Sequence, residues 1–60
     1  MMSTVERELR IGDVIIRKSD GQRMTIDFYS REAGLYFSSW YYRSTRQQDY
    51  LKAEDVEKAY

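Results

Sequence analysis

Short runs of strand-forming residues, each ended by a turn signal, follow one another through most of this chain. The runs cover residues 14–16, 24–28, 35–42 and 47–51, and most of them are rich in β-branched or aromatic side chains. The turn signals are the Asp20-Gly21 pair, a polar stretch over 30–34 and another over 43–46. Strands this short cannot enclose a core as a flat sheet, so the sheet must curl, and closing it removes exposed edges.

The two ends of the chain follow different patterns. Residues 1–8 have no apolar periodicity and are predicted to be a flexible lead-in to a single domain over 9–60. Residues 52–55 favour one helical or 3₁₀ turn, after which Val56 either starts a last short strand or caps the bottom of the barrel. The alternative is a helix over 52–60, since Ala, Glu and Lys favour helices, although about nine residues are marginal for one. The fold class expected is mainly β, a small SH3-like barrel of four or five antiparallel strands with a short helical turn near the C-terminus.

Period-two alternation assigns side chains to the two faces of the predicted strands. Met24, Ile26 and Phe28 share one face of their strand. The next strand points Tyr36, Ser38, Trp40 and Tyr42 one way, and Leu35, Phe37, Ser39 and Tyr41 the other. Trp40 is the single tryptophan, and we predict that it packs in the core on Met24 and Ile26, with a ligand-binding platform as the alternative.

If Trp40 faces the core, three large apolar side chains lie on the opposite, outward face of the same strand. These are Leu35, Phe37 and Tyr41. An outward strand face is normally polar, and an exposed apolar patch usually marks a contact site. The three residues are therefore the predicted contact surface for a protein partner or a second copy of the chain. The alternatives are a tightly bent strand that buries both faces in part, or a cover formed by residues 1–8.

Basic residues next to the aromatic run suggest a second hypothesis, that the protein binds nucleic acid. Arg17, Lys18 and Arg23 flank the first turn, and Arg43 and Arg46 lie in the third. Aromatic rings can stack on bases while Arg holds phosphate. However, ten basic and ten acidic residues give a formal net charge of zero, and phosphate neutralisation drives most of this kind of affinity. A weak nucleic-acid accessory protein is therefore the alternative to protein binding.

The chain carries no recognisable catalytic or metal-binding motif. It has no Cys and no His, which excludes disulfides and thiolate metal sites and removes the commonest metal ligand and general base. No nucleophile–base pair, P-loop or calcium-loop spacing is present. Asp13 after Gly12 is predicted to cap turn amides at a strand start, not to act in catalysis. We expect a protein that is not an enzyme and has no cofactor, metal or small-molecule ligand.

No apolar run is long enough to span a bilayer, and the polar segment 1–10 does not resemble a signal peptide. No membrane partner is therefore expected, and the predicted location is the cytoplasm.

Several short motifs together resemble the YodC-like family of small bacterial proteins, whose function is unknown. They are Ile11-Gly12-Asp13-Val14, Lys18-Ser19-Asp20-Gly21, Met24-Thr25, Gly34 and Trp40-Tyr41. The resemblance covers about residues 9–58 and implies the SH3-like fold, with no known activity. Ser38 stands where the family often has Cys, so a redox or metal role based on that Cys does not carry over. The short type II dihydrofolate reductases have a similar opening, but residues 47–50 here lack their Val and Ile.

Overall fold

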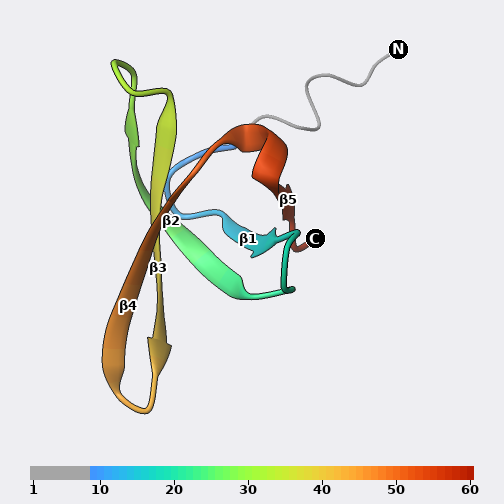
Figure 1. Cartoon of the computed structure of the whole chain (residues 1–60), viewed down its shortest axis with the longest axis vertical. Helices are drawn as coiled ribbons and strands as arrows, with labels where there is room; N and C mark the ends of the chain where they lie inside the picture. Colours follow the sequence, from blue (N-terminus) through green and yellow to red (C-terminus); the bar gives the residue numbers. More distant parts are fainter. Residues whose placement is uncertain (1–8) are drawn as a thin grey trace.

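The structure, a computed structural model, describes residues 9–60; the lead-in predicted over 1–8 lies outside them. Short strands and one 3₁₀ turn make up the fold (Figure 1). In chain order they are β1 (Val14–Arg17), β2 (Arg23–Ser30), β3 (Leu35–Tyr42), β4 (Thr45–Leu51), η2 (Ala53–Asp55) and β5 (Val56–Lys58). The mainly β class is confirmed, and so is the C-terminal turn followed by a strand. The alternative of a helix over 52–60 is wrong.

All five strands belong to one antiparallel sheet with the order β4-β3-β2-β1-β5. The last strand returns to pair with the first, and β4 and β5 form the two edges. Within residues 9–60 no ladder joins these edges, so the sheet is open. The β3–β4 hairpin extends well beyond the small unit formed by β1, β5 and the start of β2 (Figure 1).

The core is built from side chains of four strands, β1, β2, β4 and β5. The buried apolar residues are Ile15, Met24, Ile26, Leu51 and Val56, with Leu9, Tyr36 and Trp40 packed against them. Leu51 and Val56 come from the two opposite edges of the sheet, so they share one core only because the sheet curls over its inner face. Burying one such side chain stabilises the fold by about 1.5–3 kcal/mol. Trp40 lies half-buried against this core, which confirms its predicted side of β3.

The predicted face of one β2 side chain, Phe28, is wrong, and one β3 side chain, Tyr42, lies on its predicted face but is exposed. A β-bulge interrupts the β2–β3 register between Ile26 and Phe28. The extra residue, Asp27, reverses the alternation, so Ile26 is buried whereas Phe28 is 53% exposed on the other face. Tyr42 keeps the inward parity of Trp40 but is 59% exposed, because it lies at the end of β3 beside the hairpin turn, past the core.

Asp13 holds the turn that precedes β1, as the sequence predicted. Its carboxylate accepts a hydrogen bond from the Arg10 backbone N–H at 2.9 Å. The Tyr60 hydroxyl donates to the same carboxylate at 3.2 Å, and the Lys58 ammonium lies 3.7 Å away. The Arg10 hydrogen bond is the main cause that lowers the pKa of Asp13. One carboxylate thus ties the start of the described chain to its end.

The β3–β4 hairpin turns through two residues, Arg43 and Ser44, where the sequence suggested four. Both have a positive φ, 52° and 68°, as a type I′ turn requires. A residue with a Cβ pays about 1–2 kcal/mol in this conformation, whereas Asn-Gly tolerates it well.

We expect Arg43→Asn combined with Ser44→Gly to stabilise the protein by about 1 kcal/mol, because the strain of two left-handed residues is relieved. Urea unfolding should show a higher midpoint with an unchanged slope. Arg43→Ala combined with Ser44→Ala is the control and should not raise the midpoint. A lower midpoint for the Asn-Gly variant would show that this turn is not strained.

Candidate functional site

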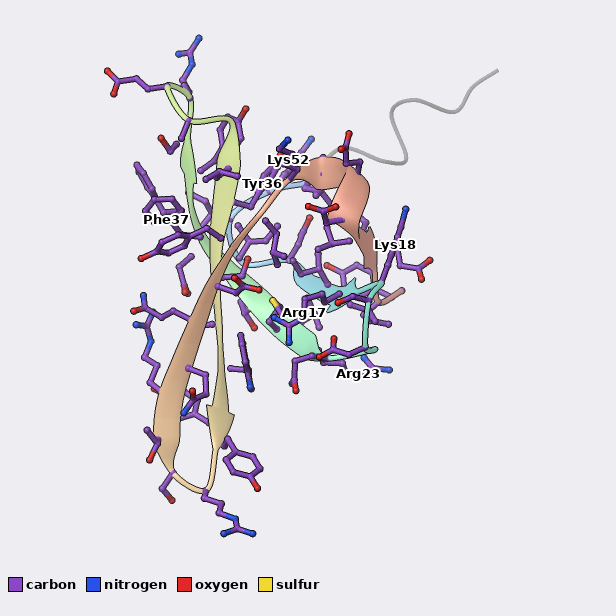
Figure 2. The ribbon with its side chains drawn as sticks, viewed as in Figure 1. Arg17, Lys18, Arg23, Tyr36, Phe37 and Lys52 are labelled. Atoms are coloured by element: carbon purple, nitrogen blue, oxygen red, sulfur yellow. The ribbon has the colours of Figure 1, made fainter. Side chains whose placement is uncertain are left out.

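Three aromatic side chains form a row across neighbouring strands on the sheet face opposite the core. Phe28 of β2 pairs with Phe37 of β3, and Phe37 pairs with Tyr50 of β4. The Phe28 and Phe37 rings meet edge to face with centroids 5.6 Å apart, and the Phe37 and Tyr50 rings stack at 4.5 Å. We call Phe28, Phe37 and Tyr50 the aromatic row. Figure 2 shows Phe37 pointing away from the side of the sheet on which β1 and Arg17 lie.

The outer two rings of the aromatic row are open to solvent and shield the middle one. Phe28 is 53% exposed and Tyr50 is 55% exposed, while Phe37 is half-buried between them. Rings that pack against each other across a sheet are held in place by their neighbours. The aromatic row is therefore a continuous, largely apolar surface whose rings support one another.

The three contact residues predicted from the sequence share the outward parity of β3. Leu35 is half-buried at the start of β3, opposite Ser30, and Phe37 is the centre of the aromatic row. Tyr41 is 70% exposed and lies opposite Arg46, close to the hairpin turn. The alternative of a strand buried on both faces applies in part to Phe37, whose cover comes from its own aromatic neighbours.

Sequence reasoning missed two members of the aromatic row, Phe28 and Tyr50. A two-residue turn at Arg43 and Ser44 would have placed Tyr50 opposite Phe37, but no Asn-Gly or Asp-Gly signal marks that turn. Phe28 depends on the bulge at Asp27, and simple alternation points it the wrong way.

An ion pair crosses the outer face beside the aromatic row. The Arg46 guanidinium of β4 donates to the Asp27 carboxylate of β2 at 3.0 Å. Because β3 lies between these two strands, the pair spans it. The bulge residue Asp27 thus neutralises Arg46 next to the aromatic row.

On the inner face, Arg17 of β1 links parts of the sheet that are far apart in the chain. Its guanidinium donates to both Asp20 carboxylate oxygens, at 2.9 and 2.7 Å, and also to Asp49 of β4. The Arg17 carbon Cζ lies 5.2 Å from the Trp40 ring centroid, a cation–π contact. In Figure 2 Arg17 lies inside the curl, between the β3–β4 hairpin and β1. The Asp20 hydrogen bonds are the main cause that raises the Arg17 pKa, so this side chain stays charged and engaged within the fold.

The five basic residues of the nucleic-acid alternative do not form one surface. Arg17 and Arg46 are both ion-paired with acids. Lys18 and Arg23 are exposed near the β1–β2 turn, where Figure 2 labels them. Arg43 lies in the turn at the far end of the β3–β4 hairpin, 5.2 Å from the Tyr42 ring centroid. A continuous basic groove is therefore not built from these residues.

The hollow beside Arg17 brings together no set of side chains that points to a reaction or a ligand. This open hollow of about 600 Å³ between β1, β4 and η2 is lined by charges of both signs, including Lys18, Asp20, Asp49 and Glu54. No group of three or more potential metal ligands occurs within residues 9–60. The same residues contain no helix with the length and apolar character needed to cross a membrane.

Comparison with known proteins finds no relative, because no family model, no curated protein and no solved structure matches the chain. The outer face is therefore interpreted from its own geometry and chemistry.

The Arg17–Asp20 contact should make stability depend on pH in acid. Hydrogen bonds from Arg17, and then from the Gln22 N–H, lower the pKa of Asp20 to about 2. A carboxylate with a lowered pKa stabilises the fold fully above its unfolded pKa of about 4, and this contribution is lost as the pH falls toward 2. Asp20→Asn should therefore unfold at a lower temperature than wild type at pH 6, with the gap closing between pH 4 and pH 2.

Thermal unfolding followed by circular dichroism across this pH range measures that gap. Glu32→Gln, in the exposed turn between β2 and β3, is the control and should follow the wild type throughout. A gap for Asp20→Asn that stays constant from pH 6 to pH 2 would contradict the assigned contact.

Proposed function

We propose that this protein is a small non-catalytic binding module whose contact surface is the outer face of β2, β3 and β4. The observation that carries the proposal is the aromatic row, with two rings more than half exposed on the face opposite the core. Packed aromatic side chains are the usual anchors of protein interfaces, since they bring large apolar area at little cost in conformational entropy. Tyr41 and Leu35 extend this surface along β3.

A protein partner fits this surface better than nucleic acid does. The Arg46 charge beside the aromatic row is already paired with Asp27, so no unpaired guanidinium there is offered to a phosphate. The Phe37 ring has neighbours on both sides, whereas base stacking needs an open ring face. The formal net charge of zero supports the same choice. A weak nucleic-acid accessory role remains the alternative and would use Lys18, Arg23 and Arg43.

The finer fold assignment is part of the same proposal. An SH3-like barrel is supported by the return of β5 to β1, by η2 between β4 and β5, and by a core to which both edge strands contribute. The YodC-like resemblance carried by residues 9–58 and the cytoplasmic location expected from the sequence belong to this proposal too. In that setting the module has a structural core on one face and its binding surface on the other.

Site-specific photocross-linking in the source cell tests the binding face. We expect a chain with p-benzoylphenylalanine in place of Tyr50 to cross-link to protein, because Tyr50 is the exposed end of the aromatic row. The matched control carries the same group in place of Tyr42, which has similar exposure but the opposite parity on the β3–β4 hairpin. Adding Phe37→Ser to the chain that carries p-benzoylphenylalanine at position 50 should abolish the cross-link while the protein stays folded.

Equal cross-linking from both positions would contradict the proposal. A cross-link from the Tyr50 position to nucleic acid, weakened steeply by salt, would favour the alternative function instead.

A further inference from the structure

The β4 strand has an unpaired edge. It is seven residues long, and within residues 9–60 it pairs with β3 alone. Residues next to a two-residue turn exchange hydrogen bonds, so Thr45 and every second residue after it bond to β3. The backbone N–H and C=O groups of Arg46, Gln48 and Tyr50 therefore face the open side. In agreement, the Tyr50 N–H bonds to the Asp49 carboxylate at 2.8 Å and not to β3.

Of the usual protections of an edge strand, β4 has one, the inward-facing charge of Asp49, and that charge is already paired with Arg17. Natural edges are kept from pairing by Lys, Pro, bulges or short length. The other edge, β5, is only three residues long and contains Lys58. By contrast, β4 has no Lys, no Pro and an unbroken register with β3. Its one cation, Arg46, reaches across β3 to Asp27, so the charge is turned away from the open edge.

We propose that two copies of this chain pair antiparallel along β4, about a two-fold axis at Gln48, to form one continuous sheet. In this register Gln48 faces its own copy, and Arg46 of each chain faces Tyr50 of the other. The outward groups of Arg46 and Gln48 and the Tyr50 C=O then find backbone partners, and the Tyr50 N–H exchanges the Asp49 carboxylate for the Arg46 C=O of the second copy. The inference goes beyond the proposed function, since it concerns the edge of the sheet and not its outer face.

The side chains of β4 favour a second copy as the occupant in this register. Gln47 lies opposite Asp49, and Thr45 opposite Leu51, so no like charges meet. Arg46 of each chain lies opposite Tyr50 of the other, where its aliphatic stem packs along the ring while its guanidinium keeps the Asp27 partner. A register shifted by two residues in one direction would place Asp49 against Asp49, and in the other direction it would leave Tyr50 without a partner. The formal net charge of zero adds no long-range repulsion between copies.

Pairing along β4 would also lengthen the aromatic row. Tyr50 of one chain would be followed by Arg46 of the second copy and then by Tyr41 of that copy. Tyr41 comes next because it lies opposite Arg46 within each chain. The two-fold axis would place a second such row parallel to the first. The dimer would thus present twice the outer face of one chain without covering it.

Gln48→Pro tests the inference at one backbone group. Proline removes the Gln48 N–H, which faces the open edge, and leaves the β3–β4 ladder intact. Gln48→Thr is the matched control, because it changes the side chain and keeps the N–H. Sedimentation velocity over a concentration series should show the wild type and Gln48→Thr moving from 7.3 kDa to twice that mass. Gln48→Pro should stay a monomer throughout, with an unchanged circular dichroism spectrum.

A second variant covers the case in which Gln48→Pro does not fold. In a synthetic chain, a methyl group on the backbone nitrogen of Gln48 removes the same N–H without the proline ring. This chain should also be monomeric. A wild type that stays monomeric at millimolar concentration overturns the inference, as does a dimer that survives both edge variants. A dimer lost with Phe37→Ser but kept with Gln48→Pro would assign self-association to the outer face, which leaves the proposed function standing.

Discussion

The curl of the sheet is the constraint on which the rest of this structure depends. Leu51 and Val56 belong to opposite edge strands, yet both are buried in one core with Ile15. Arg17 spans the inside of the curl, joining β1 to Asp49 of β4 while its guanidinium lies over Trp40. A charged group is tolerated there because its hydrogen bonds go to carboxylates. With so few buried side chains, this bridge adds a direct contact between β1 and the β3–β4 hairpin.

The same curl separates the two faces of the sheet. The inner face holds the core and the Arg17 bridge, so its aromatic residues, Tyr36 and Trp40, are partly buried against other strands. The outer face meets no second layer within residues 9–60, and the bulge at Asp27 adds Phe28 to it. A sheet covered on one side only would normally carry polar residues on the other. Here the aromatic row takes that place, and this is the observation from which we propose the outer face as the binding surface.

Local sequence signals predicted the strands, whereas the contacts between them could not be read from the chain. Alternation placed Trp40 correctly and Asp-Gly marked the first turn, because both signals act over a few residues. The bulge at Asp27 and the turn through Arg43 and Ser44 carry no such signal, so Phe28 and Tyr50 were missed. The Arg17–Asp49 contact joins residues 32 positions apart and exists only once the sheet has curled. The sequence placed Arg17 in the nucleic-acid alternative, and the structure shows it paired with Asp20 and Asp49 on the inner face of the curl.

The central claim is that the inner face of the sheet stabilises the fold and the outer face does not. It is tested by the loss in free energy of unfolding caused by Trp40→Ala and by Tyr50→Ser, measured in dilute solution. The account predicts that Trp40→Ala loses about 3 kcal/mol, since a core contact is removed. Tyr50→Ser should lose about 1 kcal/mol or less, because it truncates an exposed ring. Equal losses for the two variants would contradict the account, since the aromatic row would then stabilise the fold as much as the core does.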